Sequence, residues 1–141
     1  MRIVPIVAVL FWATANAFAA EAPKVAVAPV FSTDTTVTGQ KIEVPANPHV
    51  MVSLATFPPG AALAVHKHPY PHYVYVLEGT LTVTNTETGK VFDVPAGGFL
   101  VEMNDTWHFG KNNGAVPVKL LVIDQVPQGT TTNTIPKHLE K

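Results

Sequence analysis

Beyond the first twenty residues, the chain consists of short runs rich in Val, Thr, Phe and Tyr, separated by Pro and Gly at close intervals. β-Branched and aromatic residues favour strands, whereas Pro-Gly, Glu-Gly and Asn-Gly pairs favour turns. No window of ten or more residues in this region has the period of a helix. The pattern predicts strands at 24–30, 37–44, 49–57, 62–66, 72–77, 80–84, 90–94, 98–103 and 116–126. Many short strands at this spacing indicate a single all-β domain, either a sandwich or a closed barrel.

Alternation is clearest in the run from His72 to Leu77. One face of this predicted strand carries His72, Val74 and Val76, and the other carries Tyr73, Tyr75 and Leu77. Both faces are substantially apolar, which suits a barrel strand that packs inward on the core and outward on an oligomer contact.

The N-terminus has the pattern of a secretory signal. Arg2 precedes an apolar run from Ile3 to Ala15, and small residues follow at Ala17 and Ala19. The alternative is a membrane anchor, but the run is shorter than the roughly 18–20 residues that span a bilayer and no basic cluster follows it. We therefore expect a signal at 1–19 and export to the periplasm or the medium. The remaining expected divisions are N-terminal strands and an arm at 20–48, a barrel at 49–126 and a polar, Thr-rich tail at 127–141 that is an arm or loop.

Charge and cysteine content limit the binding partners and the metal ligands that we expect. The chain has nine Lys and Arg against ten Asp and Glu, a net charge of −1, and no basic run. Nucleic acid is therefore not an expected partner, and neither is a membrane once the signal is cleaved. The chain contains no cysteine, so metal ligands would have to be His, Asp or Glu.

Three of the six histidines fall within seven residues, as His66-x-His68-x-x-x-His72. A lone histidine is more often structural than a ligand, and a His tract on the surface binds metal only loosely. Here, however, strand-forming residues with core alternation flank the cluster. Neutral imidazole suits Zn, Cu, Fe, Ni and similar ions. Two same-face ligands, a third across the next turn and a fourth from a distant strand can meet around one ion.

At these residues the chain resembles the cupin superfamily. Its first motif is Gly, five residues, His-x-His, three or four residues, Glu, six residues, Gly. Gly60, His66, His68, His72 and Gly79 meet every spacing, with histidine in place of the usual glutamate at His72.

The second motif is Gly, five residues, Pro-x-Gly, two residues, His, three residues, Asn. Gly97, His108 and Asn112 match it, while Met103 and Asp105 replace the Pro and Gly that shape a turn. We therefore expect the loop before His108 to differ in geometry. The resemblance implies a double-stranded β-helix, also called a cupin or jelly-roll barrel, in a single domain.

The resemblance also implies one divalent transition metal (Mn, Fe, Cu, Ni or Zn) on His66, His68, His72 and His108. Histidine at position 72 would leave the full 2+ charge of the ion uncancelled, which favours anion binding or an acidic bound water. Glu102 is a further candidate, as a hydrogen-bond partner of a ligand imidazole or as a proton acceptor. The alternative for Glu102 is a solvent-facing strand residue.

Other residues carry weaker expectations. Aromatic residues that would line a substrate pocket, unless they are simply core, are Phe57, Tyr75 and Trp107. His49 and His138 lie outside both motifs and are not assigned to the site.

The function expected first is a metal-dependent oxidoreductase, dioxygenase-like or peroxide-using, that acts on a small organic substrate. The alternative is a non-catalytic periplasmic protein that binds a metal or a small ligand. An isomerase or sugar-modifying cupin ranks third, because only Glu102 offers acid–base chemistry in a suitable place. Expected partners are a small molecule and, since cupins are often dimers, a second copy of the chain.

Overall fold

The computed structural model describes residues 22–139, so the signal predicted at 1–19 lies outside the described residues. This part of the chain forms strands β1 (Pro48–Phe57), β2 (His66–Lys67), β3 (His72–Glu78), β4 (Thr80–Asn85), β5 (Val91–Pro95), β6 (Phe99–Val101), β7 (His108–Lys111), β8 (Val118–Pro127) and β9 (Ile135–Pro136), followed by a 3-10 helix, η1 (Lys137–Leu139). Within residues 22–139, no helix has the length and apolar character needed to cross a membrane.

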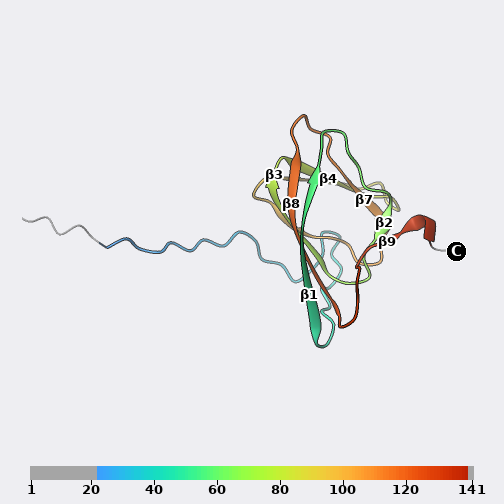
Figure 1. Cartoon of the computed structure of the whole chain (residues 1–141), viewed down its shortest axis with the longest axis horizontal. Coiled ribbons are helices and arrows are strands. Elements are labelled where there is room, and N and C mark those ends of the chain that lie inside the picture. The colour runs from blue at the N-terminus through green and yellow to red at the C-terminus, as the bar shows by residue number, and fades with distance from the viewer. Residues whose placement is uncertain (1–21, 140–141) are drawn as a thin grey trace, which may run out of the picture.

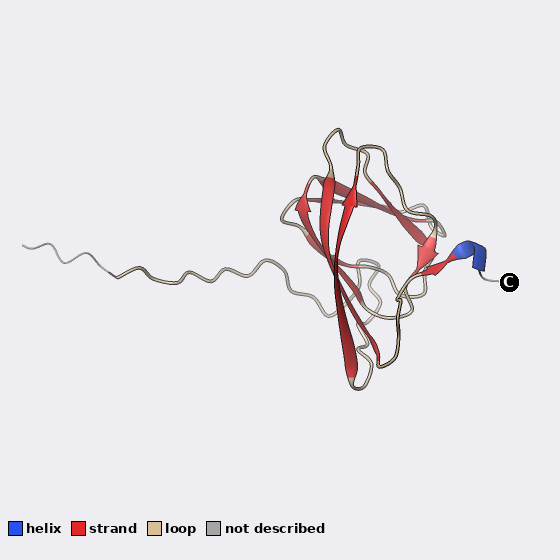
Figure 2. Ribbon diagram, viewed as in Figure 1, coloured by secondary structure: helices blue, strands red, loops and turns tan. Residues whose placement is uncertain are grey.

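The strands form two antiparallel sheets that face each other as a barrel (Figures 1 and 2). One sheet has the order β1-β8-β3-β6, and the other has the order β5-β4-β7-β2-β9. Strands that are neighbours in a sheet are often distant in sequence, as β1 and β8 are, which pair along their whole length. The predicted all-β jelly-roll barrel is confirmed.

The core lies between the two sheets and follows the period-2 alternation of the strands. In β8, Val118, Leu120 and Val122 are buried, while Lys119 between them is exposed. The core cluster comprises Phe57, Val74, Val76, Leu81, Val83, Leu100, Met103, Val118, Leu120 and Val122. Of these side chains, Phe57, Val74, Leu81, Leu120 and Val122 also line the cavity beside the histidines.

Gly79 makes possible the tight passage from β3, in one sheet, to β4, in the other. Its φ is +74°, and a Cβ at this position would lie 2.8 Å from the carbonyl oxygen of Pro117 and 2.9 Å from a methyl of Val118. Any side chain would therefore meet both an unfavourable backbone conformation and a steric clash.

The N-terminal strands predicted at 24–30 and 37–44 are absent, and that prediction is wrong. Residues 22–29 run away from the barrel (Figure 1), with Val25 92% exposed and no neighbouring strand to pair with, whereas Phe31 packs on Phe99 with ring centroids 5.2 Å apart. The second segment is a turn around Gly39 (φ +87°), closed by a single bridge between Thr35 and Lys41. The first segment has no strand to pair with, and the second makes its backbone hydrogen bonds mainly within the turn, as from the Thr36 N–H to the Gln40 carbonyl oxygen at 2.8 Å.

Two strands were not predicted. β7 begins at His108 and is only four residues long, and β9 lies in the tail that was expected to be an arm or loop. β9 pairs with β2, and the Lys137 N–H donates to the Val65 carbonyl oxygen at 2.9 Å. The tail therefore extends the five-stranded sheet.

The turn before His108 keeps a left-handed residue although the motif glycine is missing. Asp105 has φ +46°, in the region that glycine favours and that Asp tolerates better than most residues. Its N–H donates to the His68 carbonyl oxygen at 2.9 Å. The turn thus remains attached to the segment that carries His68.

Candidate metal centre

Three of the predicted histidines come together through strand register. His66 in β2 pairs directly with His108 in β7, so their side chains lie next to each other on one face of the sheet. His68 is two residues beyond His66 and points to the same side. The ring centroids are 4.6 Å apart for His66 and His108, 4.9 Å for His66 and His68, and 5.1 Å for His68 and His108.

Glu102 reaches into the middle of this group. It follows β6 and shares the inward face with Leu100, so its side chain is only 5% exposed. Its Oε2 lies 2.8 Å from His108 Nε2, 3.2 Å from His68 Nε2 and 4.0 Å from His72 Nε2. Among the described residues, ligand atoms of His66, His68, Glu102 and His108 all lie within 4.8 Å of one another. The carboxylate expected beside the site therefore lies inside it.

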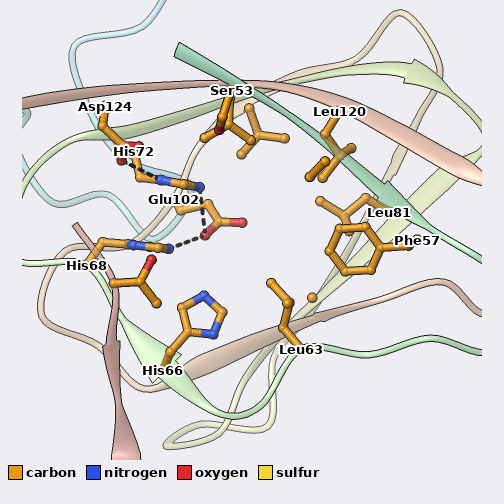
Figure 3. Close-up of a pocket in the computed structure, with 15 residues that line it drawn as sticks. Ser53, Phe57, Leu63, His66, His68, His72, Leu81, Glu102, Leu120 and Asp124 are labelled. Carbon is orange, nitrogen blue, oxygen red and sulfur yellow. Dashed lines mark hydrogen bonds and ion pairs between the residues drawn. The ribbon is translucent and has the colours of Figure 1, made fainter. Parts of the chain in front are cut away.

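His72 lies against the group in a different way (Figure 3). Its ring stacks on that of His68, with centroids 3.8 Å apart and planes 4° from parallel. An imidazole lone pair lies in the ring plane, and stacked rings approach no closer than about 3.5 Å. The lone pairs of the two Nε2 atoms therefore lie in nearly parallel planes and do not converge in this orientation. The role of His72 as a ligand stays a prediction.

The outer nitrogen of every imidazole in the cluster has a fixed acceptor. The Nδ1 atoms of His66, His68 and His108 donate to the carbonyl oxygens of Ala64 (2.7 Å), Asn133 (2.8 Å) and Thr106 (2.8 Å). The Nδ1 of His72 donates to Asp124 Oδ1 at 2.7 Å. Because carbonyl and carboxylate oxygens only accept, each Nδ1 carries the hydrogen, and in the neutral ring the inward Nε2 offers its lone pair. This is the arrangement that metal-ligating histidines require.

Burial favours neutral imidazoles here. It lowers the pKa of His66 to about 4, only partly opposed by the hydrogen bond to Ala64, and it also lowers the pKa of His68. For His108, burial acts in the same direction, but the hydrogen bond to Glu102 outweighs it and raises the pKa. Burial would raise the pKa of Glu102, but its hydrogen bond with His108 and the close approach of His68 hold that pKa well below the ordinary value. Without an ion, Glu102 and His108 therefore form a buried ion pair.

The residues present fit a divalent transition metal. His68 Nε2 is buried and, although 3.2 Å from Glu102 Oε2, has no hydrogen bond of good geometry. A buried nitrogen without a partner is costly, and a metal bond would satisfy it. Three imidazoles and one carboxylate are donors that suit Mn, Fe, Ni, Cu or Zn. The sequence had suggested an uncancelled 2+ charge, but Glu102 supplies one compensating negative charge within the cluster.

The cluster forms one end of a cavity of about 200 Å³. Figure 3 shows His66, His68, His72 and Glu102 at this end and apolar side chains at the other. The lining comprises Ser53, Ala55, Phe57, Leu63, His66, His68, His72, Val74, Leu81, Glu102, Gly110, Leu120, Val122, Asp124 and Thr134. None of these described residues is Lys or Arg.

Of the other residues considered from the sequence, one lines the cavity and the rest do not. Phe57 lines the cavity, as expected for a pocket residue, and is also part of the core. Tyr75 lies on the outer face of its sheet, beside Leu121 and Phe99. Trp107 lies outside the cavity lining, with Lys67 Nζ 5.0 Å and Lys137 Nζ 5.6 Å from its ring centroid. His49 in β1 and His138 in η1 are likewise not part of the cavity lining.

Sequence reasoning missed Asp124 and Asn133, which orient two of the histidines. Asp124 had a detectable signal, because it is the one carboxylate at an inward position of the apolar run Val118–Val126. Burial opposes its charge, yet hydrogen bonds from His72 and Asn133 keep its pKa lowered. Asn133 had no such signal, since it lies in a polar, Thr-rich tail.

The family model described as "Cupin domain" matches residues 53–124. The chain belongs to the cupin family. This match spans both histidine motifs and the strands that carry them, and it confirms the resemblance given by the motif spacings. Comparison of this cupin's sequence with curated proteins gives no match.

Solved structures show the same fold at low sequence identity. The polyketide cyclase RemF from Streptomyces resistomycificus is 18% identical, with a TM-score of 0.54 over 68% of this cupin and 65% of that chain. The DMSP lyase DddQ from Ruegeria pomeroyi is 16% identical, with a TM-score of 0.54 over 65% of this cupin and 45% of that chain. The oxalate decarboxylase from Lactobacillus farciminis is 22% identical, with a TM-score of 0.53 over 62% of this cupin and 26% of that chain. This cupin spans about two thirds of RemF and less of the other two, and the likeness concerns the fold alone.

Proposed function

We propose that this cupin holds one divalent transition metal on His66, His68, His108 and Glu102 and is a metal-dependent oxidoreductase acting on a small organic molecule. The observation that carries the metal site is the meeting of four buried donors within 4.8 Å, with the Nδ1 of each histidine already bonded outward. The originally predicted ligand set, in which His72 replaces Glu102, is the competing version of the same site.

Different residues of the chain bind the ion, orient the ligand rings and exclude water. Imidazole and carboxylate donors hold the ion, and a redox-active ion supplies electron transfer with dioxygen or peroxide as the oxidant. The acceptors Ala64, Asn133 and Thr106 keep the ligand rings oriented. The apolar wall, with Phe57, Leu81 and Leu120, excludes water and packs the substrate body.

Cavity size and charge support a restricted substrate class. About 200 Å³ is below the usual range of roughly 300–1,000 Å³ for ligand pockets, so the ligand is small. Since the lining contains no Lys or Arg, nothing there pairs with a phosphate or second carboxylate. The cavity suits a molecule with an apolar body and one oxygen-bearing, metal-binding end, such as a phenol or a diketone.

The second candidate is a periplasmic protein that binds a metal or small ligand without turnover. One observation favours it: the titratable groups lining the cavity are the cluster residues and the His72–Asp124 pair, all engaged in hydrogen bonds or metal-site contacts. No described side chain in the lining is left over as an independent general acid or base.

Elemental analysis of protein purified from its native compartment tests the metal site. We expect about one ion per chain. His66→Ala and His108→Ala should each lose most of the metal and lower the melting temperature, because each removes a ligand. The control His138→Ala, outside the cavity, should keep both. Unchanged metal content and melting temperature in the two site variants would contradict the proposal.

Turnover separates the enzyme from the binder. Protein loaded with Fe, Mn or Cu should consume dioxygen or peroxide with a small phenol or diketone, and His108→Ala should abolish this consumption. Inertness of every metal-loaded form across such a panel, with the ion still tightly bound, supports the binder instead.

Export is part of the proposal. It is supported by the basic start, apolar run and small residues of positions 1–19. Intact mass of the protein from its native compartment should show a mature N-terminus near Ala20. A full-length chain beginning at Met1 would contradict cleavage.

We also propose that two copies associate through the outer face of the four-stranded sheet. On β1, Val50, Val52 and Leu54 are exposed, Leu54 by 75%, next to the outward residues of β8, which in turn lie beside those of β3. The N-terminal segment adds further exposed apolar side chains, with Val25 and Val27 more than 90% exposed. A second copy that packs across the sheet face and this segment would bury both sets of apolar side chains.

A further inference from the structure

We propose that Asn133 is a positioning residue of the metal site, so that metal binding and docking of the C-terminal segment 131–136 stabilise each other. The inference rests on the proposed metal function. It concerns a residue from the tail, outside both histidine motifs and about 25 residues beyond His108 in the sequence.

The Asn133 side chain is buried and all its donors and acceptors are used. It is 3% exposed, its Oδ1 accepts from the Tyr70 N–H at 3.1 Å, and its Nδ2 donates to the Tyr70 carbonyl oxygen at 3.0 Å. This pair of bonds fixes the backbone at Tyr70, midway between His68 and His72. The second Nδ2 hydrogen goes to Asp124 Oδ1 at 2.7 Å.

Through these bonds Asn133 orients both stacked rings. Its carbonyl oxygen accepts from His68 Nδ1 at 2.8 Å, which directs His68 Nε2 into the cluster. Its amide holds the Asp124 carboxylate, which in turn accepts from His72 Nδ1 at 2.7 Å. The role holds whether His72 is a ligand or only a neighbour, because outer hydrogen bonds fix a ring's orientation in either case.

The adjoining tail residues reinforce the connection. In β9, Pro136 pairs with His66 and Ile135 with Lys67, and Thr134 lines the cavity. The tail therefore contacts the segments that carry His66, His68 and His72. An ion that requires these rings in fixed orientations binds more tightly to the docked tail, and by linkage the ion also stabilises docking.

An alternative is that Asn133 only ties the loop at Tyr70 to the tail. That role would affect folding stability but neither the hydrogen on each imidazole Nδ1 nor the affinity for metal in folded protein. The two roles therefore differ in measurements that do not depend on turnover.

The experiment uses the full chain, with Zn²⁺ as a diamagnetic probe. In Asn133→Ala, we expect Zn²⁺ affinity to fall about 10- to 100-fold. Alanine keeps the main-chain carbonyl that accepts from His68 Nδ1 but loses the side-chain bonds to Tyr70 and Asp124. Long-range ¹H–¹⁵N spectra should therefore show the His72 Nδ1–H signal weakened because Asp124 is no longer held, and the His68 Nδ1–H signal weakened because the tail that carries its acceptor is no longer tied to Tyr70. Thr131→Ala, an exposed position on the same tail, is the matched control and should retain both affinity and signals.

Hydrogen exchange on wild-type protein provides a test that does not depend on the variant folding. Zn²⁺ should slow exchange in residues 131–137 more than in β5, which contributes no ligand. Wild-type protein that binds Zn²⁺ without protecting the tail, or an Asn133→Ala variant with wild-type affinity and signals, overturns this inference and leaves the metal function standing. Wild-type protein that binds no metal overturns the proposed function itself.

Discussion

At the scale of single residues, the choice between Glu102 and His72 in the proposed metal site depends on the orientation of one ring. The stacked His72 ring directs its nitrogens along a plane parallel to that of His68, while Glu102 Oε2 lies within 3.2 Å of two Nε2 atoms. The motif spacing had placed His72 at the ligand position usually held by glutamate. The Glu102 carboxylate, just after β6, lies within 3.2 Å of the Nε2 atoms of His68 and His108, so a negative charge reaches the cluster from a different segment of the chain.

Comparing Glu102→Gln with His72→Ala tests this assignment. We expect Glu102→Gln to weaken metal binding more, because it removes a charged donor and leaves His108 without its ion-pair partner. In metal-free protein the same change should lower the pKa of His108, since the Glu102 carboxylate is what raises it. Calorimetric titration with Zn²⁺ and NMR titration of His108 measure the two effects. Glu43→Gln is the control, because Glu43 is exposed and does not line the cavity. A larger loss of affinity in His72→Ala would restore the four-histidine set.

At the scale of elements, very short strands and constrained turns determine which residues meet. β2 has only two residues, yet its pairing with both β7 and β9 fixes His66 opposite His108 on one side and the tail on the other. The turn at Gly79 takes the chain from β3 in one sheet to β4 in the other, where β4 lies beside β7. Loss of that turn would disturb the strands that carry His72 and His108.

Gly79→Ala and Gly89→Ala form a matched pair. Both glycines have positive φ, +74° and +75°, but an added Cβ at Gly79 meets backbone at 2.8 Å, whereas at Gly89 it meets nothing within 4 Å. We expect Gly89→Ala to cost about 1–2 kcal/mol for the left-handed backbone alone, and Gly79→Ala to cost distinctly more. Urea unfolding measures both free energies. Equal losses would show that the close approach of Pro117 and Val118 relaxes without cost.

At the scale of the whole molecule, one sheet face is unusually apolar for a surface. Val50, Val52 and Leu54 on β1 lie beside Leu121 and Ile123 on β8, which also line a shallow hollow with Phe31 of the N-terminal segment. The sequence pattern of β3 had already indicated two apolar faces. Only one of them can face the barrel core, so the other requires a different cover.

Leu54→Lys tests whether a second copy supplies that cover. Wild-type protein should sediment as a dimer, and Leu54→Lys as a monomer, because a charge would be buried without a partner at the interface. Val91→Lys is the control, since Val91 is also exposed but belongs to the opposite sheet. A wild-type monomer in analytical ultracentrifugation, or dimers in both variants, would rule out this interface.

The sequence by itself determined the class of fold, most of the barrel strands and the histidines from which the site is built. Alternation and turn residues are local properties, and the spacing of His66, His68 and His72 is readable because nearby residues in an extended chain share a face. The same local reasoning failed at 24–30, where apolar alternation is present but no neighbouring strand pairs with it.

Only the tertiary structure decided which carboxylates and hydrogen-bond acceptors contact these histidines. Glu102, Asp124 and Asn133 are brought to them from β6, β8 and the tail by strand pairing between segments distant in sequence. Ring orientation likewise depends on acceptors such as the carbonyl oxygens of Thr106 and Asn133, which any residue type could provide. The sequence specifies the identity of each side chain, whereas folding determines where a carbonyl oxygen or a distant carboxylate lies.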